Sequence, residues 1–196
     1  MIYITGDVHD MSLNSQDQKW LKKYRNITEM DCAIKYAELA EKFNIPITLF
    51  VTGLTAVSEP KKLKYLASMH NIEIGGHTWN SLQPSWKHLY YEKLKKSYYG
   101  PIKKQREDII ATKQAIEKCI SKKITSWRTH SYRSDSITLS VLSEQGFKTV
   151  SDDVGPGYKI KSLDNNLLSL PINILPDHEH VYHGYFTEGR MHNDQI

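Results

Sequence analysis

The chain has 196 residues, of which 39% are hydrophobic and 24% are charged, a composition typical of one folded globular domain. No apolar run approaches the roughly 20 residues of a membrane-spanning helix, so a transmembrane protein is excluded at this stage. The first residues lack the basic and apolar regions of a secretory signal. Cys32 and Cys119 form no CxxC pair and are expected to be reduced thiols. We therefore expect a cytoplasmic protein with one domain over residues 1–196.

The net charge of +4 is concentrated in one segment. Between Lys87 and Arg106 the chain has seven basic residues and one acid, Glu92. Such a run is either a solvated helix face or a basic patch for a phosphate-bearing substrate, nucleic acid or an anionic membrane surface. No nucleic-acid recognition motif accompanies it, so we expect no nucleic-acid partner. Contact with a membrane surface stays open.

Strand-like and helix-like segments alternate along the chain. Thr28 is a candidate helix N-cap, and the β-branched and apolar run 47–51 is typical of a strand buried on both faces. The polar, aromatic stretch 78–101 is expected to be a connection, because Pro84 and Gly100-Pro101 interrupt it. This alternation predicts an α/β fold with a parallel sheet, open or closed into a barrel. In chain order we expect a strand at 2–5, a helix at 28–43, a strand at 46–53, a helix at 60–69, a strand at 72–74, a helix at 102–120, a strand at 124–128, a helix at 136–144 and strands at 147–150, 167–170 and 181–182.

Side chains able to do acid, base or metal chemistry follow the predicted strands. In parallel α/β folds the carboxyl ends of the strands form one rim, so groups far apart in sequence converge there. The residues at these positions are Asp7 and His9, then His77, Arg128 and His130, Asp152 and Asp153, and His183.

Several of these segments occur together in a recognisable order: the opening run 2–10, the stretch 36–53, the segment Glu73 to Asn80, and later Trp127-Arg128, Gly146-Phe147 and 150–152. As a set they resemble the motifs of the polysaccharide deacetylases, the NodB-homology domain or carbohydrate esterase family four. The resemblance spans about residues 1–185. It implies a single-domain incomplete (β/α) barrel and a metal-dependent hydrolase that removes an N- or O-acetyl group from a sugar.

The sequence departs from the family pattern where metal ligands are expected. Ser81 stands where the family's second histidine would be, and His9 (or Asp10) stands where an acidic ligand would be. We expect His9 and His77 to be two ligands of a divalent transition metal, with zinc as the expected ion because imidazole favours it. Candidates for the third ligand are Asp10, His130 and the histidines His178, His180 and His183.

The resemblance also implies catalytic roles. Asp7 would be the general base and Arg128 would orient its carboxylate, while His183 would protonate the leaving group with Asp152 holding its imidazole. The family expects a proline and a tyrosine after the arginine, where this chain has Thr129-His130-Ser131-Tyr132. The backbone N–H of Tyr132 is a candidate oxyanion donor. Each residue also has a structural alternative: a cap for Asp7, a buried ion pair between Arg128 and Asp152, or a solvated loop around His183.

The expected substrate is an acetylated sugar or sugar phosphate, such as a glycan precursor in surface-polysaccharide synthesis. The aromatic residues of the 79–99 stretch either stack on sugar rings or cover the core. Two other functions stay open. In the first, the chain is a different metal-dependent amide hydrolase on the same barrel. In the second, it is a non-catalytic domain that binds a glycan or a protein.

Overall fold

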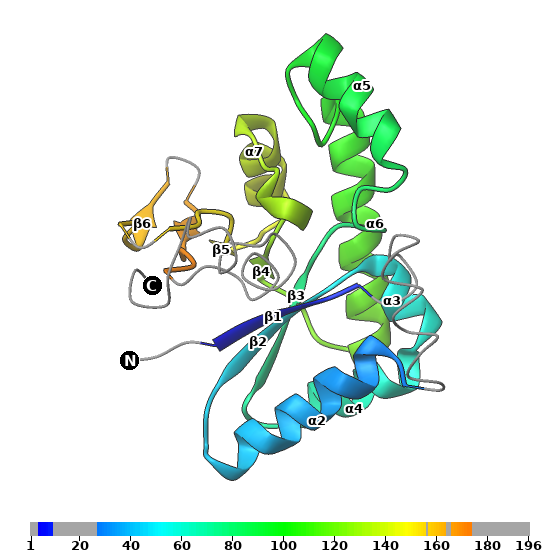
Figure 1. Ribbon diagram of the computed structural model, residues 1–196, viewed down its shortest axis with the longest axis vertical. Coiled ribbons are helices and arrows are strands. Elements are labelled where there is room, and N and C mark those ends of the chain that lie inside the picture. Colours follow the sequence, from blue (N-terminus) through cyan, green and yellow to red (C-terminus); the bar gives the residue numbers. More distant parts are fainter. Residues whose placement is uncertain (1–3, 10–26, 156, 164–165, 174–196) are drawn as a thin grey trace, which may run out of the picture.

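The computed structural model describes residues 4–9, 27–155, 157–163 and 166–173 (Figure 1). Its centre is a seven-stranded sheet in the order β1-β2-β3-β4-β5-β7-β6. All neighbouring strands are parallel except β6, which runs antiparallel to β7. The predicted α/β class with a parallel sheet is therefore confirmed. The strands are β1 (Ile4–Val8), β2 (Ile47–Val51), β3 (Ile72–Gly76), β4 (Ser126–Trp127), β5 (Thr149–Val150), β6 (Lys161–Ser162) and β7 (Leu168–Ser169).

Helices pack along the strands, and their ends follow the capping signals of the sequence. The side chain of Thr28 accepts from the backbone N–H of Asp31 and begins the first helix with a capping box, and Asp135 begins the last helix in the same way. Among the described helices, none is long and apolar enough to cross a membrane. The helices are α2 (Glu29–Lys42), α3 (Gly53–Ser58), α4 (Pro60–Ser68), α5 (Ser85–Lys95), α6 (Ile102–Ile120) and α7 (Ser136–Glu144), with a 3-10 turn η2 (His130–Tyr132).

The structure differs from the sequence expectation at several places. The stretch expected to be an irregular connection contains α5, because Pro84 lies at its N-cap, where a missing N–H costs nothing. The second strand ends at Val51, since Thr52 caps the short helix α3. The first strand continues to Val8, so Asp7 lies within it. The strand expected at 181–182 lies outside the described residues.

Two glycines at the end of β3 allow close packing beneath the next residue, His77. A Cβ atom added to Gly75 would lie 2.6 Å from the ring of Phe50, and one added to Gly76 would lie 2.6 Å from the ring of Trp127. Any larger residue would push these buried rings away. The two glycines thus let the core reach the end of β3 and fix the point from which His77 leaves the sheet.

Candidate metal centre and active site

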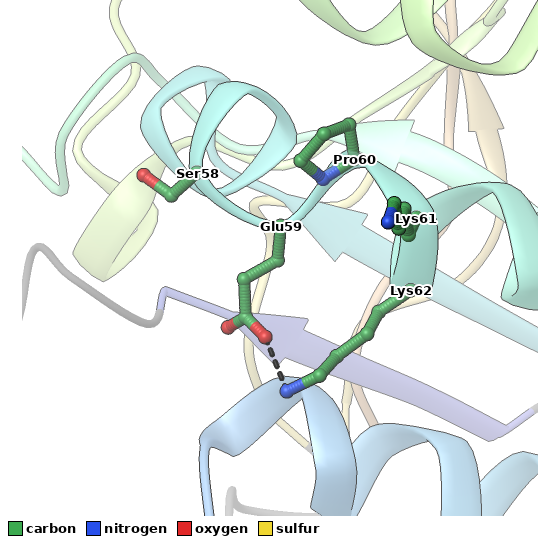
Figure 2. Close-up of a pocket in the computed structure, with 5 residues that line it drawn as sticks. All are labelled: Ser58, Glu59, Pro60, Lys61 and Lys62. Carbon is green, nitrogen blue, oxygen red and sulfur yellow. Dashed lines mark ion pairs between the residues drawn. The ribbon is translucent and has the colours of Figure 1, made fainter.

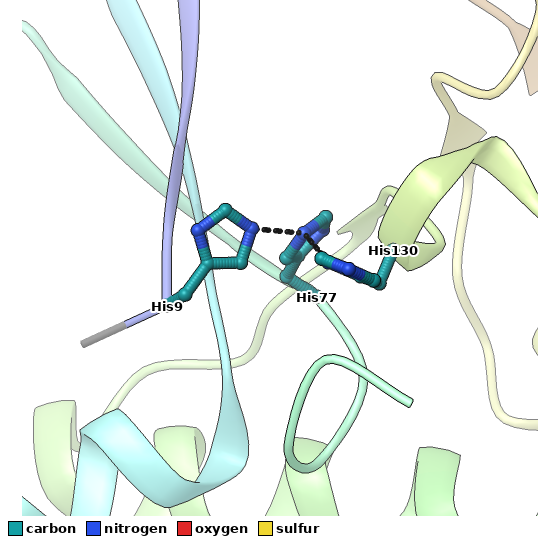
Figure 3. Close-up of side chains that lie close together, drawn as sticks. All are labelled: His9, His77 and His130. Carbon is teal, nitrogen blue, oxygen red and sulfur yellow. Dashed lines mark hydrogen bonds between the residues drawn. The ribbon is translucent and has the colours of Figure 1, made fainter. Parts of the chain in front are cut away.

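Three imidazole rings converge at the carboxyl ends of the parallel strands (Figure 3). His9 follows β1, His77 follows β3, and His130 follows β4. Nε2 of His77 lies 3.1 Å from Nε2 of His9 and 3.3 Å from Nδ1 of His130. Around a tetrahedral zinc ion with Zn–N bonds of about 2.0–2.1 Å, neighbouring ligand nitrogens are about 3.3–3.4 Å apart. The two distances from His77 are therefore close to those around a small divalent cation, and the ligand nitrogens of all three rings lie within 4.8 Å of one another.

Hydrogen bonds on the far sides of two rings assign their tautomers. Nδ1 of His77 lies 2.9 Å from the carbonyl oxygen of Arg128, which only accepts, so Nδ1 carries the proton. Nδ1 of His9 lies 3.3 Å from Oε1 of Glu29 and donates to it in the same way. When His9 is neutral, both Nε2 atoms present lone pairs to each other at 3.1 Å. Two facing lone pairs repel, and a shared cation would relieve this repulsion.

Burial favours the neutral, ligating form of His77. The side chain is 1% exposed. Burial lowers its pKa to about 4, although the nearby Asp7 carboxylate acts in the opposite direction. A neutral imidazole at physiological pH is the form that binds a metal ion.

His9 is held by the helices that follow it in the chain. Glu29, the first residue of α2, accepts from the backbone N–H of His9 at 2.8 Å as well as from its ring. The hydroxyl groups of Thr52 and Thr55 both donate to the His9 carbonyl oxygen. A carboxylate behind a ligating histidine is a common device that orients the ring and raises its basicity. The sequence identifies Glu29 only as an acidic residue in the first turn of a helix, and it does not predict the contact with His9.

His130 is placed by a tight turn with two residues in left-handed conformation, Ser131 (φ 54°) and Tyr132 (φ 57°). Such φ values are uncommon outside glycine and recur at functional sites. The backbone N–H of Tyr132 donates to the carbonyl oxygen of Thr129 at 2.8 Å. This N–H is therefore occupied by the turn, and its expected role as an oxyanion donor is dropped.

Asp7 and Arg128 form an ion pair beside the histidines. Nη1 of Arg128 donates to Oδ1 of Asp7 at 2.7 Å, and Oδ2 of Asp7 lies 3.8 Å from Nε2 of His77. The guanidinium group is also fixed by Thr5 and by Ser151, and it lies over the ring of Phe50. Burial by itself raises the pKa of Asp7, but His77, Arg128 and His9 lower it by more, to about 2. Asp7 is thus an ionised carboxylate facing the ring of His77.

Asp152 has a different environment from Asp7. Its Oδ1 accepts from the backbone N–H of Thr129 at 2.7 Å, just before His130. Burial raises the pKa of Asp152 to about 6. The guanidinium group of Arg128 pairs with Asp7 and not with Asp152, so the alternative of a buried ion pair between Arg128 and Asp152 is wrong.

Asp108 on α6 anchors the loop that leaves His77. Its carboxylate accepts from the backbone N–H of Trp79 at 3.0 and 3.1 Å and from the hydroxyl of Tyr99 at 2.6 Å. Burial raises the pKa of Asp108 to about 6, and these hydrogen bonds offset only part of that effect. The sequence offered no signal for this contact, because it joins two segments 29 residues apart.

The structure brings together Asp7, His9, His77, Arg128 and His130 of the predicted site residues. Of the described candidates for the third ligand, His130 lies with His9 and His77 in a group that could hold a metal ion. Ser81, at the family's second histidine position, is buried in the loop after His77 with a φ of 56°. Asp153 binds Ser169 and Lys161 on the far strands. Asp10, His178, His180 and His183 lie outside the described residues.

Two surface hollows lie elsewhere. One of about 340 Å³ is lined by Ser58, Glu59, Pro60, Lys61 and Lys62 between α3 and α4 (Figure 2). Its Glu59 and Lys62 pair with each other, and Lys62 also contacts Asp31 at 2.9 Å. The other, of about 330 Å³, is bordered by the Trp79 loop, α5 and α6. The histidine cluster borders neither hollow.

The polysaccharide deacetylase family profile matches residues 31–150 of the sequence. This match covers more than half of the chain, and the chain belongs to that family. None of the curated proteins matches the sequence significantly.

Solved structures show the same fold. The chain is similar to a protein from Mycobacterium smegmatis assigned as a polysaccharide deacetylase, with a TM-score of 0.65 and 20% identity over 87% of this chain and 57% of that one. It is also similar to the deacetylase PplD of Streptococcus pyogenes in complex with acetate (TM-score 0.52, 15% identity, 89% and 65% covered). A third is a pseudoenzyme of the CE4 family from Bacillus anthracis (TM-score 0.52, 13% identity, 76% and 42% covered). The chain thus spans less than two thirds of the length of each of these proteins. Their similarity confirms the expected incomplete barrel.

Proposed function

We propose that this chain is a metal-dependent deacetylase that hydrolyses an N- or O-acetyl group on a sugar. The observation that carries the proposal is the convergence of three imidazoles beside an ionised aspartate that is paired with a buried arginine. His9, His77 and His130 would hold the cation, with zinc as the expected ion. When bound, such an ion polarises a carbonyl group and acidifies a water molecule.

Asp7 is the proposed general base. Its Oδ2 faces the ring of His77 at 3.8 Å, while Oδ1 is bound by Arg128. An ionised carboxylate at this place can take a proton from a water molecule that attacks the acetyl carbon. Arg128 holds one oxygen of the carboxylate and so leaves the other directed at the histidines.

His183 stays the proposed acid for the leaving amine or alcohol. Its predicted partner Asp152 has one oxygen bound to the Thr129 N–H, and its buried Oδ2 has no hydrogen-bond partner in the described part of the chain. A buried carboxylate oxygen with unused acceptor capacity suits an imidazole N–H. We propose that His183 supplies that donor.

The acetylated sugar is inferred from the family and from the acetate complex of the Streptococcus pyogenes deacetylase. A glycan precursor inside the cell is the proposed natural substrate. The competing function is a domain that binds a glycan or protein without catalysis. It is favoured by Ser81 at a ligand position of the family and by the pseudoenzyme among the structural neighbours.

The deciding experiment measures metal content by inductively coupled plasma mass spectrometry after zinc reconstitution, together with acetate release from N-acetylglucosamine oligomers and acetylated sugar nucleotides. We expect about one zinc per chain and acetate release, with both lost in His77→Ala and in His130→Ala. His70→Ala is the matched control, because His70 lies on the surface and pairs only with Glu41 among described residues. Full metal content in His77→Ala, or a metal-free wild type, would favour the binding domain.

A further inference from the structure

An exposed stripe of large apolar side chains runs along α5. Trp86 is 71% exposed, and Leu89, Tyr90 and Leu94 are each more than half exposed. Their spacing of three and four residues places them on one face of the helix. The opposite face contacts the protein through His88, the one residue of α5 that is buried.

The stripe is embedded in positive charge. α5 itself carries three lysines and one glutamate, and Lys96 follows at its C-cap. The glutamate, Glu92, is paired with Arg133. No acidic group of the described residues forms an ion pair with Lys93, Lys95 or Lys96. An apolar face with Trp, Leu and Tyr that also carries Lys93, with Lys87 and Lys96 at its edges, is the pattern of helices that lie in the interface of an anionic membrane.

A second helix gives the comparison within the same molecule. α2 also exposes large apolar side chains, with Leu39 at 53% and Phe43 at 68%. Its sequence, however, holds four acidic residues and two lysines. An exposed apolar stripe alone is therefore not special to α5. The combination of that stripe with excess positive charge is what separates the two helices.

We propose that α5 is a docking surface for anionic lipid membranes. In Figure 1, α5 projects at one end of the molecule beyond α6, so a flat surface can reach it. The same loop that begins with His77 leads into α5 after residue 84.

The test is sedimentation of the full chain with sucrose-loaded vesicles, without metal or sugar, so that its result is independent of the proposed deacetylase activity. We expect binding to phosphatidylcholine vesicles that contain phosphatidylserine and little binding to phosphatidylcholine alone, with loss of binding as salt increases. Lys93→Glu with Lys96→Glu should weaken binding by about tenfold or more. Trp86→Ser with Leu89→Ser should weaken it by about as much, roughly tenfold.

The matched control is Leu39→Ser with Phe43→Ser on α2, which should bind vesicles as the wild type does. Circular dichroism checks that each variant is folded. A second readout is the blue shift of Trp fluorescence on vesicle binding, which should disappear in Trp86→Phe while sedimentation persists. Equal binding to both lipid mixtures, or unchanged binding in both α5 variants, would overturn the proposal. So would a wild type that binds no vesicles but forms a dimer that Trp86→Ser with Leu89→Ser dissociates.

Discussion

Asp7 and Asp108 are both largely buried acids close to the His77 segment, and their surroundings differ. Asp7 faces the guanidinium group of Arg128 and the ring of His77, and its pKa falls to about 2. Asp108 faces the hydroxyl of Tyr99 and the amide N–H of Trp79, and burial raises its pKa to about 6. The same side chain is thus held ionised in one place, while in the other burial favours its protonated form, and the neighbours decide which.

The largest effect that separates the two acids is on activity. Asp7→Asn should lower the rate of acetate release by about 10²–10⁴-fold, because the general base is lost. Its zinc content should stay near that of the wild type, since the three histidines remain. Asp108→Asn should keep most of the activity. Equal losses in the two variants would show that Asp7 has no special catalytic part.

A smaller effect is expected from the carboxylate behind His9. Glu29→Gln should weaken zinc binding by about 10–100-fold, because the ring loses its charged acceptor. Competition with a fluorescent zinc chelator measures this affinity. Glu41→Gln is the control, since Glu41 also lies on α2 and also pairs with a histidine, His70, but on the surface. If both variants bind zinc as tightly as the wild type, Glu29 does not support the centre.

The smallest effect concerns stability and pH. In the folded state Asp108 has a pKa of about 6, above its ordinary value of 3.8, so between these values the folded protein binds more protons than the unfolded chain. Stability should therefore fall as pH rises from about 4 to 6.5, by on the order of 1–3 kcal/mol from this group. Asp108→Asn should remove that part of the slope in urea unfolding series. An identical slope in both proteins would contradict the raised pKa.

Much of the fold could be predicted from the sequence, because its signals are local. Thr28 is an N-cap as expected, and the β-branched run 47–51 forms a central strand. α5 was missed because Pro84 and Gly100 were interpreted as interruptions of a connection, whereas they flank a helix. β6 was missed because its two exposed residues have no strand periodicity.

The site was predictable only in part. His9, His77, Asp7 and Arg128 were expected because each follows or ends a strand, and parallel strands bring their ends together. The position of His130 beside His9 and His77 depends on the turn at Ser131 and Tyr132, and the sequence carries no signal for that turn. The supports Glu29 and Asp108 act across gaps of 20 and 29 residues, and local patterns carry no information on such contacts.

The central claim is that His9, His77 and His130 together hold one metal ion. X-ray absorption spectroscopy at the zinc edge, on protein reconstituted with one equivalent of zinc and passed through gel filtration, tests it directly. The account predicts three imidazole ligands with Zn–N distances of about 2.0–2.1 Å in the wild type, and loss of the bound zinc in His130→Ala. A spectrum with fewer than three imidazoles in the wild type, unchanged by His130→Ala, would contradict it.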